Sequence, residues 1–129
     1  MRQRALIDLV IRFTDAFNRD DLDAVMAFFA DDAVYDEFNG TRSRGAAAIR
    51  AAFAPQFRGD YGRVRFHIED VFADADSGKA LIRWRCTLEG GPVDGSWRGL
   101  DILHVDAGQI THKLTYAKAD APRIEPSVR

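Results

Sequence analysis

Apolar residues near the start of the chain recur at helical spacing. They follow one another at steps of four, three and four, and they are Leu6, Val10, Phe13 and Phe17. An α-helix has about 3.6 residues per turn, so this spacing predicts one helix with a single apolar face. A second apolar stretch follows. Asp20 or Asp21 can cap it by accepting the free backbone N–H groups of its first turn.

A short strand and a third helix are expected next. The pair Asp31-Asp32 closes the second helix, and "AVYDEF", residues 33–38, favours an extended chain through its Val and Tyr. After a loop, "GAAAIRAAFA", residues 45–54, is rich in Ala and predicts a helix. Pro55 is expected to end or kink it, because Pro lacks an N–H and clashes with the preceding turn.

The second half of the chain has the two-residue alternation of β-strands, with turn-forming residues in between. The alternating segments are 63–72, 79–88, 94–105 and 110–118. Helices first and consecutive strands afterwards predict an α+β domain of order α-α-β-α-β-β-β-β, with the helices packed on one side of a curved, mostly antiparallel sheet. We expect a single domain over residues 1–119. Residues 120–129 contain two Pro and are expected to form a loosely attached tail.

Composition excludes several classes of protein. Hydrophobic residues make up 47% and charged residues 29%, with a net charge of −2, so a basic nucleic-acid-binding face is not expected. No apolar run approaches the ~20 residues that span a membrane. A lone Cys86 fits a reducing compartment and a cytoplasmic protein. With three scattered His, it offers no metal-ligand spacing, and we expect neither a metal nor a cofactor.

Three segments carry a resemblance to a known family. They are "FNRDDLDAVMAFFADDAVYDEFNG" (17–40), "GAAAIRAAF" (45–53) and "GLDILHVDAGQI" (99–110). Together with the order of elements, they resemble the nuclear transport factor 2-like superfamily, closest in pattern to its SnoaL-like and ketosteroid-isomerase-like branch. The resemblance runs from about Arg4 to Lys118. It implies a cone-shaped sheet around a cavity that binds small molecules.

The same resemblance implies candidate catalytic residues. The carboxylate base of the ketosteroid isomerases falls on Glu37, and a slip of one residue would put Asp36 in its place. The buried acid of that family, which stays protonated and donates a hydrogen bond to the forming enolate, falls on Asp101. The Tyr donor on the first helix falls on Phe13, which has no proton to donate.

Asp101 is also unusual when the family resemblance is left aside. It shares a strand face with apolar residues, and a lone buried charge is costly. Three interpretations stay open: a salt bridge to Arg83, Arg85 or Arg98; a functional acid in a pocket; or an exposed edge position. Epoxide hydrolases of the superfamily use an Asp–Arg–Asp set. Arg98 is expected on the face opposite Asp101, so that match requires Arg85 in its place.

Aromatic residues are expected both in the core and on the cavity wall. They are Phe13, Phe17, Phe29, Phe53, Trp84 and Trp97. The family register turns Lys113 and Thr115 toward the cavity, where Lys113 could bind an anionic substrate or pair with Asp101. His104 shares the other sheet face with Leu100 and Ile102. We expect this outer face to join two copies in a homodimer.

Two functions remain open. The first is a cofactor-independent isomerase, cyclase, or hydratase/dehydratase that acts on a small apolar carbonyl compound through carboxylate acid–base chemistry. The alternative is a non-catalytic carrier, sensor or accessory module that binds a small ligand. In both cases the expected partner is a small hydrophobic molecule, with no nucleic acid and no membrane.

Overall fold

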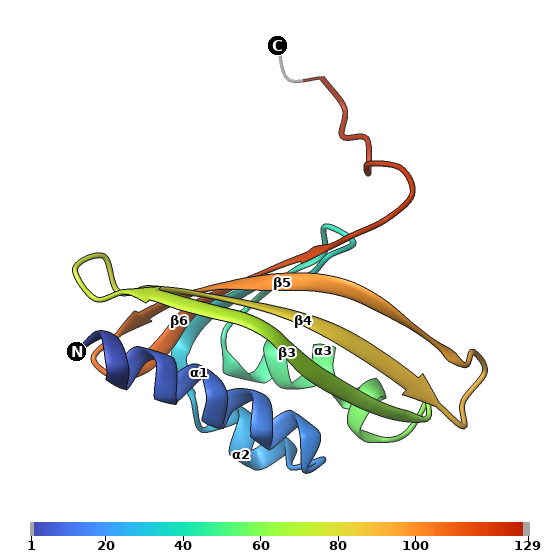
Figure 1. Ribbon diagram of the computed structural model, residues 1–129, viewed down its shortest axis with the longest axis horizontal. Helices are drawn as coiled ribbons and strands as arrows, with labels where there is room; N and C mark the ends of the chain where they lie inside the picture. The colour runs from blue at the N-terminus through green and yellow to red at the C-terminus, as the bar shows by residue number, and fades with distance from the viewer. Residues whose placement is uncertain (1, 128–129) are drawn as a thin grey trace.

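Three helices in the N-terminal half cover one face of a six-stranded sheet in the computed structural model, which describes residues 2–127 (Figure 1). The helices are α1 (Gln3–Asn18), α2 (Leu22–Met26) and α3 (Ala46–Phe57). The strands are β1 (Phe29–Asp36), β2 (Arg42–Arg44), β3 (Arg63–Asp74), β4 (Lys79–Glu89), β5 (Gly95–Asp106) and β6 (Gln109–Ala117).

The strand order in the sheet is β2-β1-β6-β5-β4-β3. The pair β1–β6 is parallel and the other pairs are antiparallel, so the sheet is mixed but mostly antiparallel. This confirms the predicted α+β class. The three-residue strand β2 was not predicted. It lies in the segment expected to be a loop, and it forms because Arg44 pairs with Val34 of β1.

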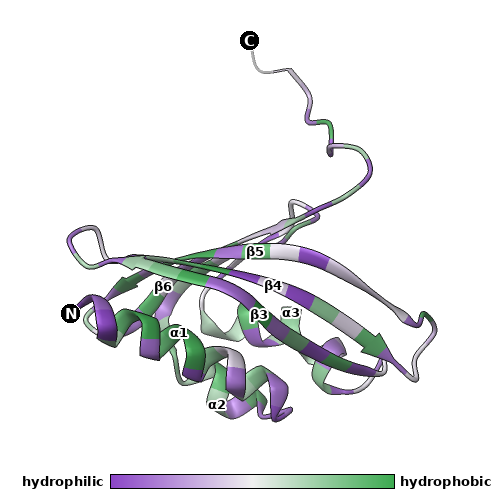
Figure 2. Cartoon of the chain, in the orientation of Figure 1, coloured by the Kyte–Doolittle hydropathy of each residue, from purple (hydrophilic) through white to green (hydrophobic). Residues whose placement is uncertain are grey.

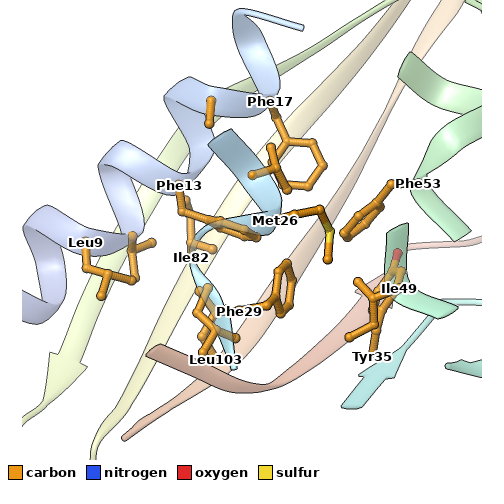
Figure 3. Packing of buried hydrophobic residues seen from close by; sticks show 14 of the residues in the cluster. Leu9, Phe13, Phe17, Met26, Phe29, Tyr35, Ile49, Phe53, Ile82 and Leu103 are labelled. Carbon is orange, nitrogen blue, oxygen red and sulfur yellow. The ribbon is translucent and has the colours of Figure 1, made fainter. Parts of the chain in front are cut away.

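The core lies between the helices and the inner sheet face. Phe13 of α1 packs edge to face on Phe17 and Phe29, with ring centroids 5.1 and 5.6 Å apart, and Ile82 and Leu103 approach from the sheet (Figure 3). Alternating purple and green bands along β3 to β5 in Figure 2 follow the expected two-residue pattern. The apolar face of α1 and the inward positions of the strands therefore form one core.

Several local expectations were wrong. The second helix ends at Met26, and Asp31 and Asp32 are exposed residues inside β1 rather than a helix end. The strand starts early because Phe29 pairs with Ile110 of the distant β6. Such long-range pairing overrides local signals.

A further difference concerns the place where the third helix ends. Pro55 lies inside α3, which continues to Phe57. The ring of Phe57 packs 5.6 Å from that of Phe17, and this contact holds the last turn in place.

Residues 118–127 form neither helix nor strand, and Figure 1 shows them leading away from the sheet. Residue 1, at the start of the predicted domain, and residues 128–129, at the end of the predicted tail, lie outside the described residues. Within residues 2–127 no helix has the length and apolar character needed to cross a membrane. Ile102 and His104 lie half-buried on the sheet face that no helix covers, and pairing of two copies through this face stays a prediction.

Candidate functional site

A cavity of about 320 Å³ lies between the helices and the inner sheet face. Its wall is largely aromatic, and these residues are Phe13, Phe17, Tyr35, Phe38, Phe53, Tyr61, Phe66, Trp84 and Trp97. Three charged side chains interrupt this wall: Glu37, Asp101 and Lys113. An apolar cavity with a few polar groups is the usual form of a small-molecule site.

Asp101 is the centre of a buried polar cluster and is 6% exposed. Its Oδ1 accepts hydrogen bonds from Lys113 Nζ at 3.1 Å and Thr115 Oγ1 at 2.5 Å. Its Oδ2 accepts one from Trp84 Nε1 at 3.1 Å. The register of the sheet brings these side chains together, because Asp101 of β5 lies opposite Thr115 of β6.

Three donors on two carboxylate oxygens are what an ionised Asp accommodates, since an ionised carboxylate only accepts. Asp101 therefore forms a buried ion pair, and its partner is Lys113 rather than any of the three Arg considered. The arrangement does not fit a protonated acid aimed at a ligand, because both oxygens already face protein donors. These contacts favour a structural ion pair, and the role that the resemblance implied for Asp101 stays a prediction.

The three candidate Arg lie elsewhere. Arg98 donates to Glu69, with Nε and Oε1 3.0 Å apart, and Arg85 is its direct cross-strand neighbour. Arg83 is exposed. Among the described residues that line the cavity there is no Arg, so the Asp–Arg–Asp set expected for epoxide hydrolysis is not assembled.

Lys113 is 5% exposed and lies over two aromatic rings. Its Nζ is 4.4 Å from the centre of the Tyr35 ring and 5.7 Å from that of Phe53, which are cation–π distances. Burial alone lowers the pKa of Lys113, but the Asp101 carboxylate and Tyr35 outweigh it, and the pKa lies above its ordinary value. Lys113 therefore carries its charge at neutral pH.

Tyr35 is a cavity residue that the sequence analysis missed. Its side chain is 8% exposed, and burial raises the pKa of its hydroxyl, although the Lys113 charge opposes the shift. The signal was present in the sequence, because the alternation that turns Glu37 inward turns Tyr35 inward as well.

Glu37 and Asp36 lie on opposite sides of the chain. Glu37 lines the cavity, and partial burial raises the pKa of its carboxyl against the opposing effect of Lys113. Asp36 points away and accepts from Arg42 Nε at 2.6 Å. Asp36 is therefore not an alternative base inside the cavity.

Seven of the eight predicted ligand-contacting residues line the cavity: Phe13, Phe17, Phe53, Trp84, Trp97, Lys113 and Thr115. Phe29 does not, because it packs in the core behind Phe13. Cys86 also lies on the cavity wall, although its sequence pattern did not predict this. Burial raises the pKa of its thiol to about 11, which leaves it protonated and a poor nucleophile. No group of three or more His, Cys, Asp or Glu within residues 2–127 is placed to hold a metal ion.

Comparisons with known proteins agree with this geometry. The SnoaL-like domain family matches residues 10–113. A candidate polyketide cyclase from Xanthomonas campestris pv. campestris is 30% identical with a TM-score of 0.74, over 88% of this chain and 90% of that chain. An LEH-like epoxide hydrolase from M. tuberculosis is 28% identical to this chain with a TM-score of 0.72, and the match covers 90% of this chain and 84% of that chain.

Another similar structure carries no assigned activity. An NTF2-like protein of unknown function from Mesorhizobium loti is 25% identical with a TM-score of 0.77, over 92% of this chain and 95% of that chain. No curated protein matches the chain significantly. The family match over most of the chain and the shared fold lead to one conclusion: the chain belongs to the SnoaL-like domain family of the nuclear transport factor 2-like superfamily.

Proposed function

We propose that the cavity binds a small, mostly apolar carbonyl compound and that Glu37 acts on it as a general base. The reaction class is that of an isomerase, cyclase, or hydratase/dehydratase that begins by removing a proton next to the carbonyl. One observation carries the proposal. Among the described cavity residues, Glu37 is the carboxylate without an ion-pair partner, and burial raises its pKa.

A raised pKa suits this role. A base works best when its pKa approaches the working pH, because it then holds an abstracted proton while still being ionised before the reaction. When Glu37 takes the proton, the C–H electron pair becomes part of an enolate and negative charge moves to the carbonyl oxygen. The positive charge of Lys113 already lowers the pKa of Glu37. The same charge would stabilise negative charge on the carbonyl oxygen of the ligand.

Similar proteins support the choice among reaction classes. The Xanthomonas structure named as a candidate polyketide cyclase favours chemistry on carbonyl compounds. The epoxide hydrolase-like structure is similar in fold, but this chain has no Arg on the cavity wall among the described residues. We therefore favour proton abstraction over epoxide opening.

A second candidate is a non-catalytic carrier of the same kind of ligand. Two observations favour it. Phe13 offers no hydrogen bond where the resemblance implies a donor, and the oxygens of Asp101 are already taken by Trp84, Lys113 and Thr115. A carrier needs the apolar cavity but makes no use of the base.

Hydrogen–deuterium exchange separates the two candidates without knowledge of the natural substrate. The protein is incubated in D₂O with a library of aryl and cyclic ketones, and deuterium next to each carbonyl is measured by mass spectrometry. We expect Glu37→Gln to slow the catalysed exchange by about 10²- to 10⁴-fold, the usual contribution of a general base. Asp36→Asn is the matched control and should leave the rate unchanged, because Asp36 points away from the cavity.

Binding is followed in the same samples by tryptophan fluorescence, because both Trp of the chain line the cavity. Ketones that quench this fluorescence but gain no deuterium with the wild-type protein would contradict the enzyme and support the carrier. An equal loss of exchange in both variants would mean that Glu37 has no special role.

A further inference from the structure

Two hydrogen-bond donors, the Lys113 ammonium and the Tyr35 hydroxyl, line the same cavity. The Lys113 ammonium has three N–H groups, and two of them go to Asp101 and Thr115. The Tyr35 hydroxyl lies close enough to Lys113 and Thr115 to interact with both, and these contacts affect the pKa values of Tyr35 and Lys113. Tyr35 also lines the cavity, so a ligand bound there can meet this hydroxyl.

These two donors lie side by side. Lys113 Nζ is 4.4 Å from the centre of the Tyr35 ring, and both groups act on each other's pKa. The Tyr35 ring in turn packs 4.9 Å from that of Phe53 (Figure 3). An acceptor atom of a ligand at this end of the cavity would therefore lie near both a neutral donor and a charged donor.

We propose that the Tyr35 hydroxyl and the Lys113 ammonium form a binding site for an anionic oxygen, and that it takes the enolate or phenolate oxygen of a flat conjugated ligand. The inference rests on the proposed function, since it concerns the oxygen end of the same ligand. In this arrangement Tyr35 of β1 and Lys113 of β6 supply the hydrogen bonds that Phe13 of α1 cannot donate.

The charges around the site favour an anion at this position. The negative charge of Asp101 is shielded by Trp84 and Thr115, which occupy its oxygens from two sides. Glu37 is the other acid facing the cavity, and it is nearest to neutral once it has taken a proton. An oxygen that becomes negative beside Lys113 is then opposed only by Asp101, whose carboxylate is already paired with Lys113.

Both donors keep their protons at neutral pH. The pKa of Tyr35 lies above 10.0 and that of Lys113 above 10.5, because burial raises the former and the carboxylate of Asp101 supports the latter. Asp101 does not touch the ligand in this arrangement. It is a positioning residue, because it fixes where the Lys113 ammonium points.

The test measures binding of 4-nitrophenolate, with nitrobenzene as the apolar probe of similar shape. Dissociation constants come from tryptophan fluorescence at a pH where the phenol is ionised. We expect the wild-type protein to prefer 4-nitrophenolate and Tyr35→Phe to weaken its binding by about 10- to 100-fold, since hydrogen bonds to charged groups contribute about 1.5–3 kcal/mol. Nitrobenzene should bind both proteins equally.

A Tyr outside the cavity supplies the matched control. Tyr116→Phe changes an exposed residue on the outer sheet face. It should bind 4-nitrophenolate like the wild type. If Tyr35→Phe does not fold, the visible absorption band of 4-nitrophenolate bound to the wild type is the second readout. A shift from its position in water, matching that of a hydrogen-bonded phenolate, supports the site.

The outcomes distinguish this inference from the proposed function. A wild-type protein that binds nitrobenzene as tightly as 4-nitrophenolate overturns the inference, as does a Tyr35→Phe variant that weakens both ligands equally. Glu37→Gln should still bind 4-nitrophenolate, because the charge it removes is negative. If that variant retains ketone exchange while Tyr35→Phe loses its preference for the phenolate, Glu37 is not the base but the anion site stands.

Discussion

The buried pair Asp101–Lys113 decides what each of its members can do. Neither charge is stable in an apolar interior alone, and each is held by the other together with Thr115 and Trp84. This coupling makes Asp101 a structural member of the site rather than an independent acid.

Asp101→Asn tests this coupling. We expect it to lower the free energy of unfolding by about 3–5 kcal/mol, because it leaves the buried Lys113 ammonium without its carboxylate. Urea unfolding followed by circular dichroism gives the value. Glu69→Gln is the matched control: it breaks the exposed pair with Arg98 and should cost less than about 1 kcal/mol. Equal costs for the two variants would mean that Lys113 does not depend on Asp101.

The sequence predicted part of this site. An acid in an apolar strand face marked Asp101, and the family register turned Lys113 inward. Tyr35 was missed because a Tyr in a short strand is an ordinary core residue. A functional role for its hydroxyl is suggested only by the proximity of Lys113 of β6. That proximity comes from the parallel pairing of Tyr35 with Lys113, between strands nearly eighty positions apart in sequence.

At the scale of elements, Gly99 of β5 allows the donor Trp84 to reach Asp101. A methyl group on Gly99 would collide with the backbone carbonyl of Tyr116 and would lie 2.7 Å from Cη2 of Trp84. The Trp84 ring therefore lies across β5 at the position where a side chain is missing, and its Nε1 reaches the carboxylate.

Gly99→Ala should displace Trp84 and lower the free energy of unfolding by about 1–3 kcal/mol, the usual cost of overpacking. A changed tryptophan emission spectrum would report the displacement. Gly95→Ala lies on the same strand, where an added methyl group meets nothing within 4 Å, and it should be nearly neutral. Similar spectra for Gly99→Ala and the wild type would contradict the proposed role of Gly99.

The elements themselves were largely predictable, and the exceptions have a common cause. Periodicity located the long helices and strands because their buried faces follow regular spacing. Phe29 to Asp32 became strand, and α3 continued past Pro55, because of contacts with β6 and with Phe17 that no local pattern encodes. Local signals therefore fail where distant segments supply the deciding contact.

At the scale of the whole molecule, the cavity is part of the core. Phe13 and Phe17 hold α1 against the other elements and also line the cavity, so folding and ligand binding depend on the same side chains. The protons held by Tyr35 and Lys113 should then affect the stability of the entire fold.

Stability should fall steeply in alkaline solution. Tyr35 and Lys113 have pKa values raised from 10.0 and 10.5, so the folded chain keeps protons that the unfolded chain releases. Where the unfolded state binds fewer protons, the free energy of unfolding decreases as pH rises. The contribution is complete below about pH 10 and is lost as pH rises through the folded pKa values.

Urea unfolding between pH 8 and pH 11 measures this slope. Tyr35→Phe removes one of these protons, so its stability should decline less steeply than that of the wild type. Tyr116→Phe, on the exposed outer face, should retain the wild-type slope. If all three proteins decline in parallel, the Tyr35 proton does not contribute to the pH dependence. The loss then comes from Lys113 and from Cys86, because burial raises the pKa of that thiol to about 11.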